Sequence, residues 1–228
     1  MRVLIYSHDS FGLGHLRRCR RIAHAMTETR KILSVLIISG SPIIGSFDFK
    51  SRVDFVRVPG VVKLRSGEYT PLNLHVDIED TLRLRASIIR HTAEVFAPDL
   101  FIVDKEPLGL GGEVSETLAM LKTRGAMLAL GLRDVMDDPE TLRMEWARKD
   151  VAPARADLYD AIWSYGVDAL FDPLDGVGAP ERARRKATFT GYLRSVAPQS
   201  WKVRPAPPTE KRYLLVTPGG GGDGVEMV

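Results

Sequence analysis

Short apolar segments alternate with longer segments of mixed polarity over most of the chain. Continuous apolar runs of this length are typical of strands that are buried on both faces of a sheet. Where helical segments separate such strands, the pattern favours a parallel sheet with helices on both faces. The expected strands are residues 3–6, 35–39, 53–58, 100–103, 127–132, 161–165 and 188–192. The pattern therefore predicts an α/β fold with a doubly wound, mostly parallel, Rossmann-like sheet.

The segments between these strands predict helices. In the first, apolar residues recur at helical spacing on one stripe: Leu16, Cys19, Ile22, Ala23 and Met26. Further helices are expected over about residues 76–96, after Gly111-Gly112, and from Asp138, where an N-cap residue precedes a proline. Residues 59–75 have no clear period and are predicted as a long loop, of the kind that often binds ligands.

The composition is that of a globular protein with a sizeable core. Of the 228 residues, 44% are hydrophobic and 27% are charged. No apolar run approaches the roughly 18 residues that a membrane span needs, and no signal-peptide core follows Met1-Arg2, so we expect a cytoplasmic protein. Cys19 is the single cysteine, which excludes an internal disulfide and is expected to be a packed thiol.

Basic residues gather in two clusters, at residues 17–21 and 182–186, and the net charge is +3. Neither cluster is interleaved with aromatic residues, so we expect no nucleic-acid partner. A solvated helix face explains both clusters, while peripheral contact with an anionic membrane is the alternative for residues 17–21.

The composition changes near the carboxyl end. Residues 197–208 are rich in proline, and an apolar segment at residues 213–217 then leads into a glycine-rich turn. One strand cannot bury its own face, so we expect it to open a second α/β domain that is cut short. The predicted division is a domain over residues 1–196, a linker over 197–212 and the start of the second domain over 213–228.

The loop after the first strand carries two glycines, Gly12 and Gly14, immediately before the first helix. It resembles a dinucleotide-binding loop, but Arg17 stands at the third glycine position and the second strand ends without an acidic residue. NAD is therefore not expected as a cofactor. The loop predicts a positively polarised site for an anionic or sugar-like group.

His15 lies at the start of the first helix, where the helix dipole favours the neutral imidazole. A neutral imidazole can act as a base, although a capping or ligand-orienting role is the alternative.

Charged residues also follow two later strands. Asp104, Lys105 and Glu106 could serve as base, cation and hydrogen-bond acceptor around one substrate, or form a local ion-pair cluster. Arg133 and Asp134 could bind a substrate or pair with each other. Since no His or Glu at ligand spacing accompanies the nearby aspartates, no metal site is expected.

Four segments, taken in order, resemble a known family: residues 7–18, 103–107, 131–134 and 189–192. Together they are similar to the predicted bacterial glycosyltransferases of the GT-B fold, distant relatives of the transferase that adds N-acetylglucosamine to lipid-linked peptidoglycan precursors. The resemblance implies an acceptor-binding amino-terminal domain and a carboxyl-terminal domain that binds a nucleotide-sugar donor as substrate, without a further cofactor.

The resemblance also implies residue roles. His15, at the position of the loop histidine, would be the base or would orient the acceptor. Together with the charged residues at the later strand ends, this predicts a site with His15, Asp104 and Glu106 as catalytic residues. The predicted substrate-binding residues are Gly12, Gly14, Arg17, Lys105, Arg133 and Asp134. The donor-phosphate loop would be Gly219, Gly220, Gly221 and Gly222. Catalysis in such folds usually needs no metal, since helix dipoles and backbone amides neutralise the leaving diphosphate. This stretch of chain alone is expected to be inactive.

The sequence therefore predicts a glycosyltransferase that moves a sugar from a nucleoside-diphosphate sugar to an acceptor. The alternatives are a nucleotide-sugar hydrolase or epimerase of the same fold, in which the histidine activates water or a sugar, and a non-catalytic sugar- or phosphate-binding module.

Overall fold

The computed structural model describes residues 1–8, 13–64, 68–133, 136, 140, 142–144, 158–194, 212 and 214. The chain divides into two compact units, Met1–Leu193 and Arg194–Val228. In the second unit only residues 194, 212 and 214 are described. The proposed linker and the second-domain strand and glycine loop thus fall almost wholly outside the described residues, and their boundaries stay predictions.

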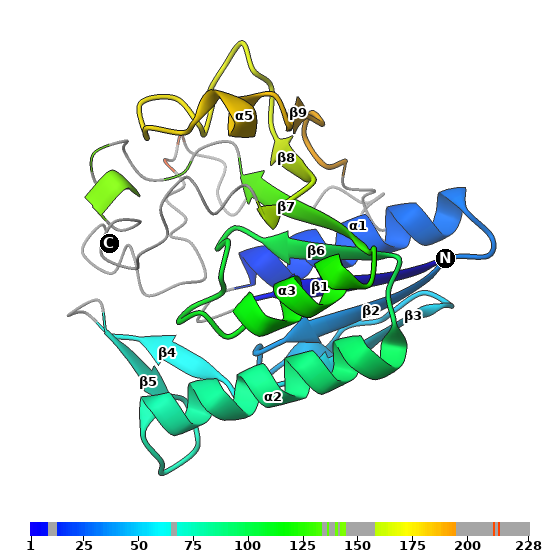
Figure 1. The fold of residues 1–228 in the computed structure, drawn as a ribbon, viewed down its shortest axis with the longest axis vertical. Coiled ribbons are helices and arrows are strands. Elements are labelled where there is room, and N and C mark those ends of the chain that lie inside the picture. The colour runs from blue at the N-terminus through cyan, green and yellow to red at the C-terminus, as the bar shows by residue number, and fades with distance from the viewer. Residues whose placement is uncertain are drawn as a thin grey trace. The chain divides into compact units, whose positions relative to one another are not determined.

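A seven-stranded sheet in the order β3-β2-β1-β6-β7-β8-β9 forms the centre of the first unit (Figure 1). Every neighbouring pair of strands in it is parallel. Its strands are β1 (Arg2–Ser7), β2 (Ser34–Ser39), β3 (Val53–Arg57), β6 (Leu100–Asp104), β7 (Met127–Arg133), β8 (Ala161–Tyr165) and β9 (Ala187–Phe189). The predicted doubly wound α/β fold is confirmed.

The last strand differs from its prediction. Residues 188–192 were expected to be extended, but β9 ends at Phe189. Gly191 has φ 71°, in the left-handed region, which turns the chain out of the strand conformation.

Two hydrophobic clusters cover the two faces of the sheet, because successive residues of each strand point to opposite sides. One cluster joins Val3, Ile5 and Ile102 to Leu16 and Cys19 of helix α1 (Gly14–Thr29). The buried Cys19 is a packed thiol, as expected.

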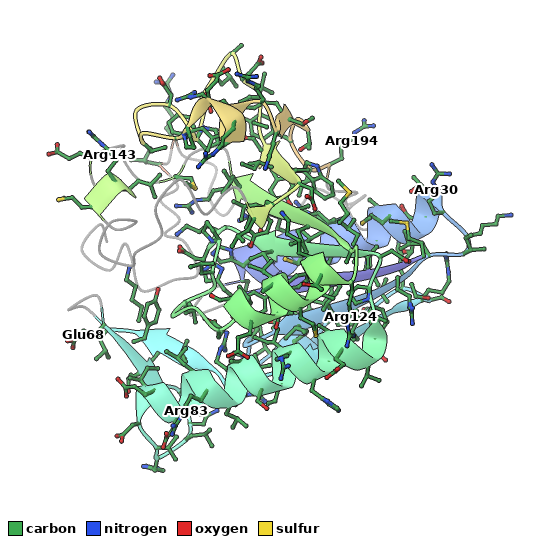
Figure 2. The ribbon with its side chains drawn as sticks, in the orientation of Figure 1. Arg30, Glu68, Arg83, Arg124, Arg143 and Arg194 are labelled. Atoms are coloured by element: carbon green, nitrogen blue, oxygen red, sulfur yellow. The ribbon has the colours of Figure 1, made fainter. Side chains whose placement is uncertain are left out.

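The other cluster packs under helices α2 (Ile78–Phe96) and α3 (Ser115–Thr123), which lie in front of the sheet in Figure 1, while α1 lies behind it. It joins Leu4 and Phe101 to Ile89 and Leu118. Charged side chains such as Arg30 and Arg83 point away from the sheet (Figure 2). Two shorter helical segments are η1 (Ile44–Ser46) and α5 (Glu181–Arg184).

The predicted long loop over residues 59–75 contains a hairpin that the sequence analysis missed. Strands β4 (Val61–Lys63) and β5 (Tyr69–Pro71) pair in antiparallel fashion and form a separate two-stranded sheet. Three-residue strands are too short to show a two-residue period, which explains the error.

The helix expected from Asp138 begins outside the described residues, although residues 140 and 142–144 are helical. No helix among the described residues is long and apolar enough to cross a bilayer.

Candidate functional site

The carboxyl ends of β1, β6 and β7 lie side by side, because β6 is placed between the other two strands. Asp104 is the last residue of β6 and is paired in register with Gly131 of β7. In open parallel sheets, ligands bind beyond this edge. The sheet therefore delivers Asp104 to the position where a ligand site is expected.

His15 of α1 contacts Asp104 directly. The His15 Nδ1 atom lies 2.6 Å from Asp104 Oδ2, and the two side chains are 18% and 1% exposed. An ionised carboxylate can only accept a hydrogen bond, so Nδ1 donates the proton, and in the tautomer that carries its proton on Nδ1 the lone pair lies on Nε2. These two predicted site residues thus form a dyad that orients the imidazole as a proton acceptor.

Arg18 occupies the other oxygen of the same carboxylate. Its Nη1 donates to Asp104 Oδ1 at 3.1 Å. Arg18 follows His15 by three residues, so both side chains leave the same face of α1. The guanidinium supplies the positive charge that a nearly fully buried carboxylate needs.

A second imidazole lies beside the dyad. The His8 and His15 ring centroids are 4.2 Å apart, and His8 Nδ1 lies 3.1 Å from the Asp104 backbone oxygen. His8 follows β1 directly and is 4% exposed. It packs against His15 and restricts the orientation of that ring.

Lys105 and Glu106, which follow Asp104 in the chain, form an ion pair with each other. Lys105 has φ 64°, and its backbone nitrogen donates to Gly131 O at 2.7 Å. The Lys105 Nζ atom lies 3.4 Å from Glu106 Oε1. This ion pair is of the kind that the alternative of a local cluster predicts, and the substrate role of Asp104, Lys105 and Glu106 stays a prediction.

The other predicted site residues have varied positions. Arg133 ends β7, and within the described part of the chain its buried Nε has no hydrogen-bond partner. Gly14 begins α1, and a Cβ built there meets no atom within 4 Å, so folding alone does not require this glycine. Arg17 is exposed on α1. Gly12, Asp134, Gly219, Gly220, Gly221 and Gly222 lie outside the described residues.

Tyr165, the last residue of β8, contacts Arg18 through its ring. The Arg18 guanidinium carbon lies 5.7 Å from the centre of the Tyr165 ring. Burial raises the pKa of the Tyr165 phenol well above its usual range, with Asp104 adding to the shift and Arg18 opposing it. The phenol is therefore neutral, and its ring presents a π-face to the cation.

His8, His15 and Asp104 bring three possible metal ligands within 4.8 Å of one another. Two ligands at about 2.0–2.1 Å from a tetrahedral metal are roughly 3.3 Å apart, whereas His15 Nδ1 and Asp104 Oδ2 are 2.6 Å apart. Arg18 also places a positive charge on the carboxylate. The geometry between His15 and Asp104 thus fits a hydrogen bond better than a pair of metal ligands.

Arg18 and Tyr165 were not among the predicted site residues, and His8 entered only as part of residues 7–18, one of the segments that carry the resemblance. The three-residue spacing from His15 was a signal for Arg18. Nothing in the local pattern indicated Tyr165, because its contact with Arg18 depends on the placement of β8.

Comparison with protein-family models gives no match, and neither does comparison with curated proteins. Solved structures share the fold. A UGT transferase from Siraitia grosvenorii in complex with UDP aligns with a TM-score of 0.55 and 13% identity, over 87% of this chain and 52% of that one. A UDP-glucosyltransferase from Polygonum tinctorium capable of glucosylating indoxyl gives 0.53 and 14%, over 88% and 55%.

A glycosyltransferase from Rickettsia africae aligns with a TM-score of 0.50 and 10% identity, over 82% of this chain and 42% of that one. At these identities the likeness establishes the fold, which is the GT-B glycosyltransferase-like fold expected from the sequence. The chain spans about half the length of the first two of these proteins.

Proposed function

We propose that the chain forms the acceptor-side domain of a metal-independent glycosyltransferase that uses a nucleoside-diphosphate sugar. The observation that carries the proposal is the 2.6 Å hydrogen bond between His15 Nδ1 and Asp104 Oδ2 at the ligand-binding edge of the sheet. The fold shared with UDP-glycosyltransferases supports it. The sequence resemblance to distant relatives of the peptidoglycan N-acetylglucosaminyltransferase is a second argument for the same proposed class.

His15 is the general base in this proposal. Its Nε2 lone pair takes the proton of an acceptor hydroxyl while the hydroxyl oxygen forms a bond to the anomeric carbon of the sugar. The bond from that carbon to the diphosphate oxygen breaks, and the nucleoside diphosphate leaves with the bonding electrons. Asp104 accepts the Nδ1 hydrogen bond throughout and stabilises the imidazolium that forms.

Donor binding is assigned in this proposal to a second domain. Gly219–Gly222 would approach the diphosphate. Backbone amides and a helix dipole would neutralise the negative charge of this group. Lys105, Arg133 and Arg17 remain candidates for substrate contacts, and Glu106 for a catalytic contact.

The test uses the complete gene product with a panel of nucleoside-diphosphate sugars and hydroxyl acceptors. Both His15→Gln and Asp104→Asn should lower the release of nucleoside diphosphate, by about 10²–10⁴-fold for the histidine variant. His91→Gln, which changes an exposed histidine on α2, is the matched control and should retain full turnover.

The outcomes separate the proposal from its rivals. Unchanged turnover in His15→Gln would remove the proposed base. Free sugar released without an acceptor would favour a hydrolase, and a C2-inverted nucleotide sugar would favour an epimerase. Nucleotide-sugar binding with no product of any kind would favour a binding module.

A further inference from the structure

We propose that Arg18 and Tyr165 are positioning residues that hold the Asp104 carboxylate in the orientation that His15 requires. The inference rests on the proposed function, because it concerns how the His15–Asp104 dyad is kept ready. Neither residue is assigned contact with the substrate.

A continuous chain of contacts leads from the sheet to the imidazole. The Tyr165 ring lies 5.7 Å from the Arg18 guanidinium carbon, Arg18 donates to Asp104 Oδ1 at 3.1 Å, and Asp104 Oδ2 lies 2.6 Å from His15. The terminal torsion of an aspartate has broad minima, so the side chain by itself does not fix either oxygen. With Oδ1 anchored by Arg18, Oδ2 is directed to His15.

The Tyr165 ring restricts a guanidinium that would otherwise move on a long, flexible side chain. Burial strengthens this arrangement: Tyr165 is 7% exposed and the Arg18 side chain is 14% exposed. Cation–π attraction is stronger when both groups are removed from water. The aromatic face therefore keeps Arg18 against Asp104 instead of releasing it to solvent.

Gly131 makes room for the ring. A Cβ at this position would lie 2.2 Å from the Tyr165 hydroxyl oxygen and 2.8 Å from the ring carbon that bears it. Gly131 is also the register partner of Asp104, so the ring reaches across β7 towards the end of β6. A side chain at position 131 would therefore push Tyr165 away from the site.

The ring, and not the hydroxyl, carries this role. Within the described residues the Tyr165 hydroxyl has no hydrogen-bond partner. Removing it should therefore cost little, whereas removing the aromatic face should release Arg18. Tyr165→Phe and Tyr165→Leu thus form a matched pair that separates the two groups.

The experiment is proton NMR of residues 1–228 labelled with ¹⁵N-histidine, which reports the hydrogen-bonded Nδ1 proton of His15 independently of turnover. The resonance is assigned by its loss in His15→Gln. We expect it to persist in Tyr165→Phe and to broaden or disappear in Tyr165→Leu and Arg18→Met, because the carboxylate gains freedom to rotate. Arg21→Met, an exposed arginine one turn further along α1, is the control and should leave it unchanged.

Turnover of the gene product gives the second readout. Tyr165→Phe should stay within about twofold of the parent, while Tyr165→Leu and Arg18→Met should lose roughly 10–100-fold in kcat with little change in KM. Arg18→Lys keeps the charge but not the planar group, so its kcat should lie between that of Tyr165→Phe and that of Arg18→Met. Because it keeps the charge beside Asp104, it also serves as the conservative variant if Arg18→Met fails to fold.

The two proposals can fail separately. A His15 resonance that is unchanged in both Tyr165→Leu and Arg18→Met would overturn the positioning role, even if His15 is the base. A resonance that responds as expected, with full turnover in His15→Gln, would overturn the proposed function and leave the positioning role standing.

Discussion

Gly131 lies next to Asp104 in the register of the sheet, and its missing side chain is used by a residue from the next strand. Tyr165 fills the space over Gly131 and stacks with Arg18, which binds Asp104. At the scale of single residues, the orientation of Asp104 thus depends on Gly131, which contacts no ligand in the proposed function, and on Arg18, which is less exposed than its neighbour Arg17.

The variant Gly131→Ala tests this crowding. The new methyl group would overlap the Tyr165 ring, so we expect a loss of about 1–3 kcal/mol in the free energy of unfolding, measured in urea. Gly14→Ala is the control: it adds a methyl group to open space at the first residue of α1 and should be neutral or slightly stabilising. Equal stability of the two variants would contradict the close packing of Tyr165.

Helix α1 is held to the connection between β2 and β3 through His24. The His24 Nε2 atom accepts a hydrogen bond from the Lys50 backbone nitrogen at 3.3 Å, and the Phe49 ring meets the imidazole edge-on. Burial lowers the pKa of His24, and the charges of Arg20 and Lys50 add to the shift. The neutral ring is therefore the form that packs at this contact between elements.

Acidification should weaken this contact. The unfolded chain takes up the His24 proton at a higher pH than the folded chain does, so the stability is present above about pH 6.5 and is lost as the pH falls through the folded pKa. We expect the Tm to fall less between pH 7.5 and pH 5.5 in His24→Gln than in the parent. Parallel Tm curves for the two proteins would show that His24 does not contribute.

Helix α2 contributes a fully buried ionic group on the other face of the sheet. Arg85 donates to Tyr6 Oη of β1 and to the Pro59 backbone oxygen, both at 2.6 Å, and lies 3.5 Å from Glu113. Glu113 accepts hydrogen bonds from Tyr6 and from the Gly111 backbone nitrogen. The group ties α2 to β1, to the start of the hairpin segment and to the loop that follows β6.

Removing one member should cost more than removing both charges. Arg85→Met leaves Glu113 buried without its cation, and we expect a loss of about 3–5 kcal/mol in the free energy of unfolding. The double variant Arg85→Met/Glu113→Gln should lose less free energy of unfolding than the two single variants lose together. The difference, which is the coupling energy, should be at least about 1 kcal/mol. Additive losses in urea titrations would show that the two charges do not interact.

At the scale of the whole molecule, the described residues of the first unit form one seven-stranded parallel sheet, and the candidate site lies at its carboxyl edge. The solved structures of the same fold are longer than this chain, which covers 52% and 55% of the two described first. In the proposed function this unit binds the acceptor, and the donor is bound mainly by other residues.

Nucleotide binding tests this division. Calorimetry with nucleotides and nucleoside-diphosphate sugars should show binding at least about tenfold weaker for residues 1–193 than for the complete gene product, or about 1.4 kcal/mol. The 193-residue unit has its own buried core, and its folding is checked first by circular dichroism. Equal affinities would mean that the loop before α1 binds the nucleotide.

The basic cluster on α1 gives a last prediction for the molecule's outer surface. Arg17 and Arg21 are exposed, whereas Arg18 binds Asp104 and the Arg20 guanidinium lies 5.2 Å from the Phe47 ring centre. If this surface contacts a membrane, Arg17→Gln/Arg21→Gln should weaken sedimentation with anionic vesicles by about 1 kcal/mol per residue, and salt should do the same. Arg83→Gln on α2 is the control. Vesicle binding that is unchanged by both the double substitution and added salt would exclude the contact.

The parallel sheet and its long helices could be predicted from the sequence because the spacing of apolar residues within these elements shows which side chains are buried. This spacing is a local property, as in the runs at residues 3–6 and 100–103 and in the stripe from Leu16 to Met26. His15 and Asp104 could be nominated because parallel strands place their carboxyl ends at one edge. The hairpin β4–β5 was missed because its strands are too short for a period.

Only the tertiary structure decided which of the nominated side chains meet. His15 and Asp104 are 89 residues apart in the chain, and Arg18 and Asp104 are 86 apart. Their contacts require β6 to lie next to β1, and the contact of Arg18 with Tyr165 requires the position of β8. Hydrophobic periodicity specifies which face of an element is buried but not the neighbour it is buried against. The partners of Asp104 therefore follow from the strand order and from the packing of α1 on the sheet.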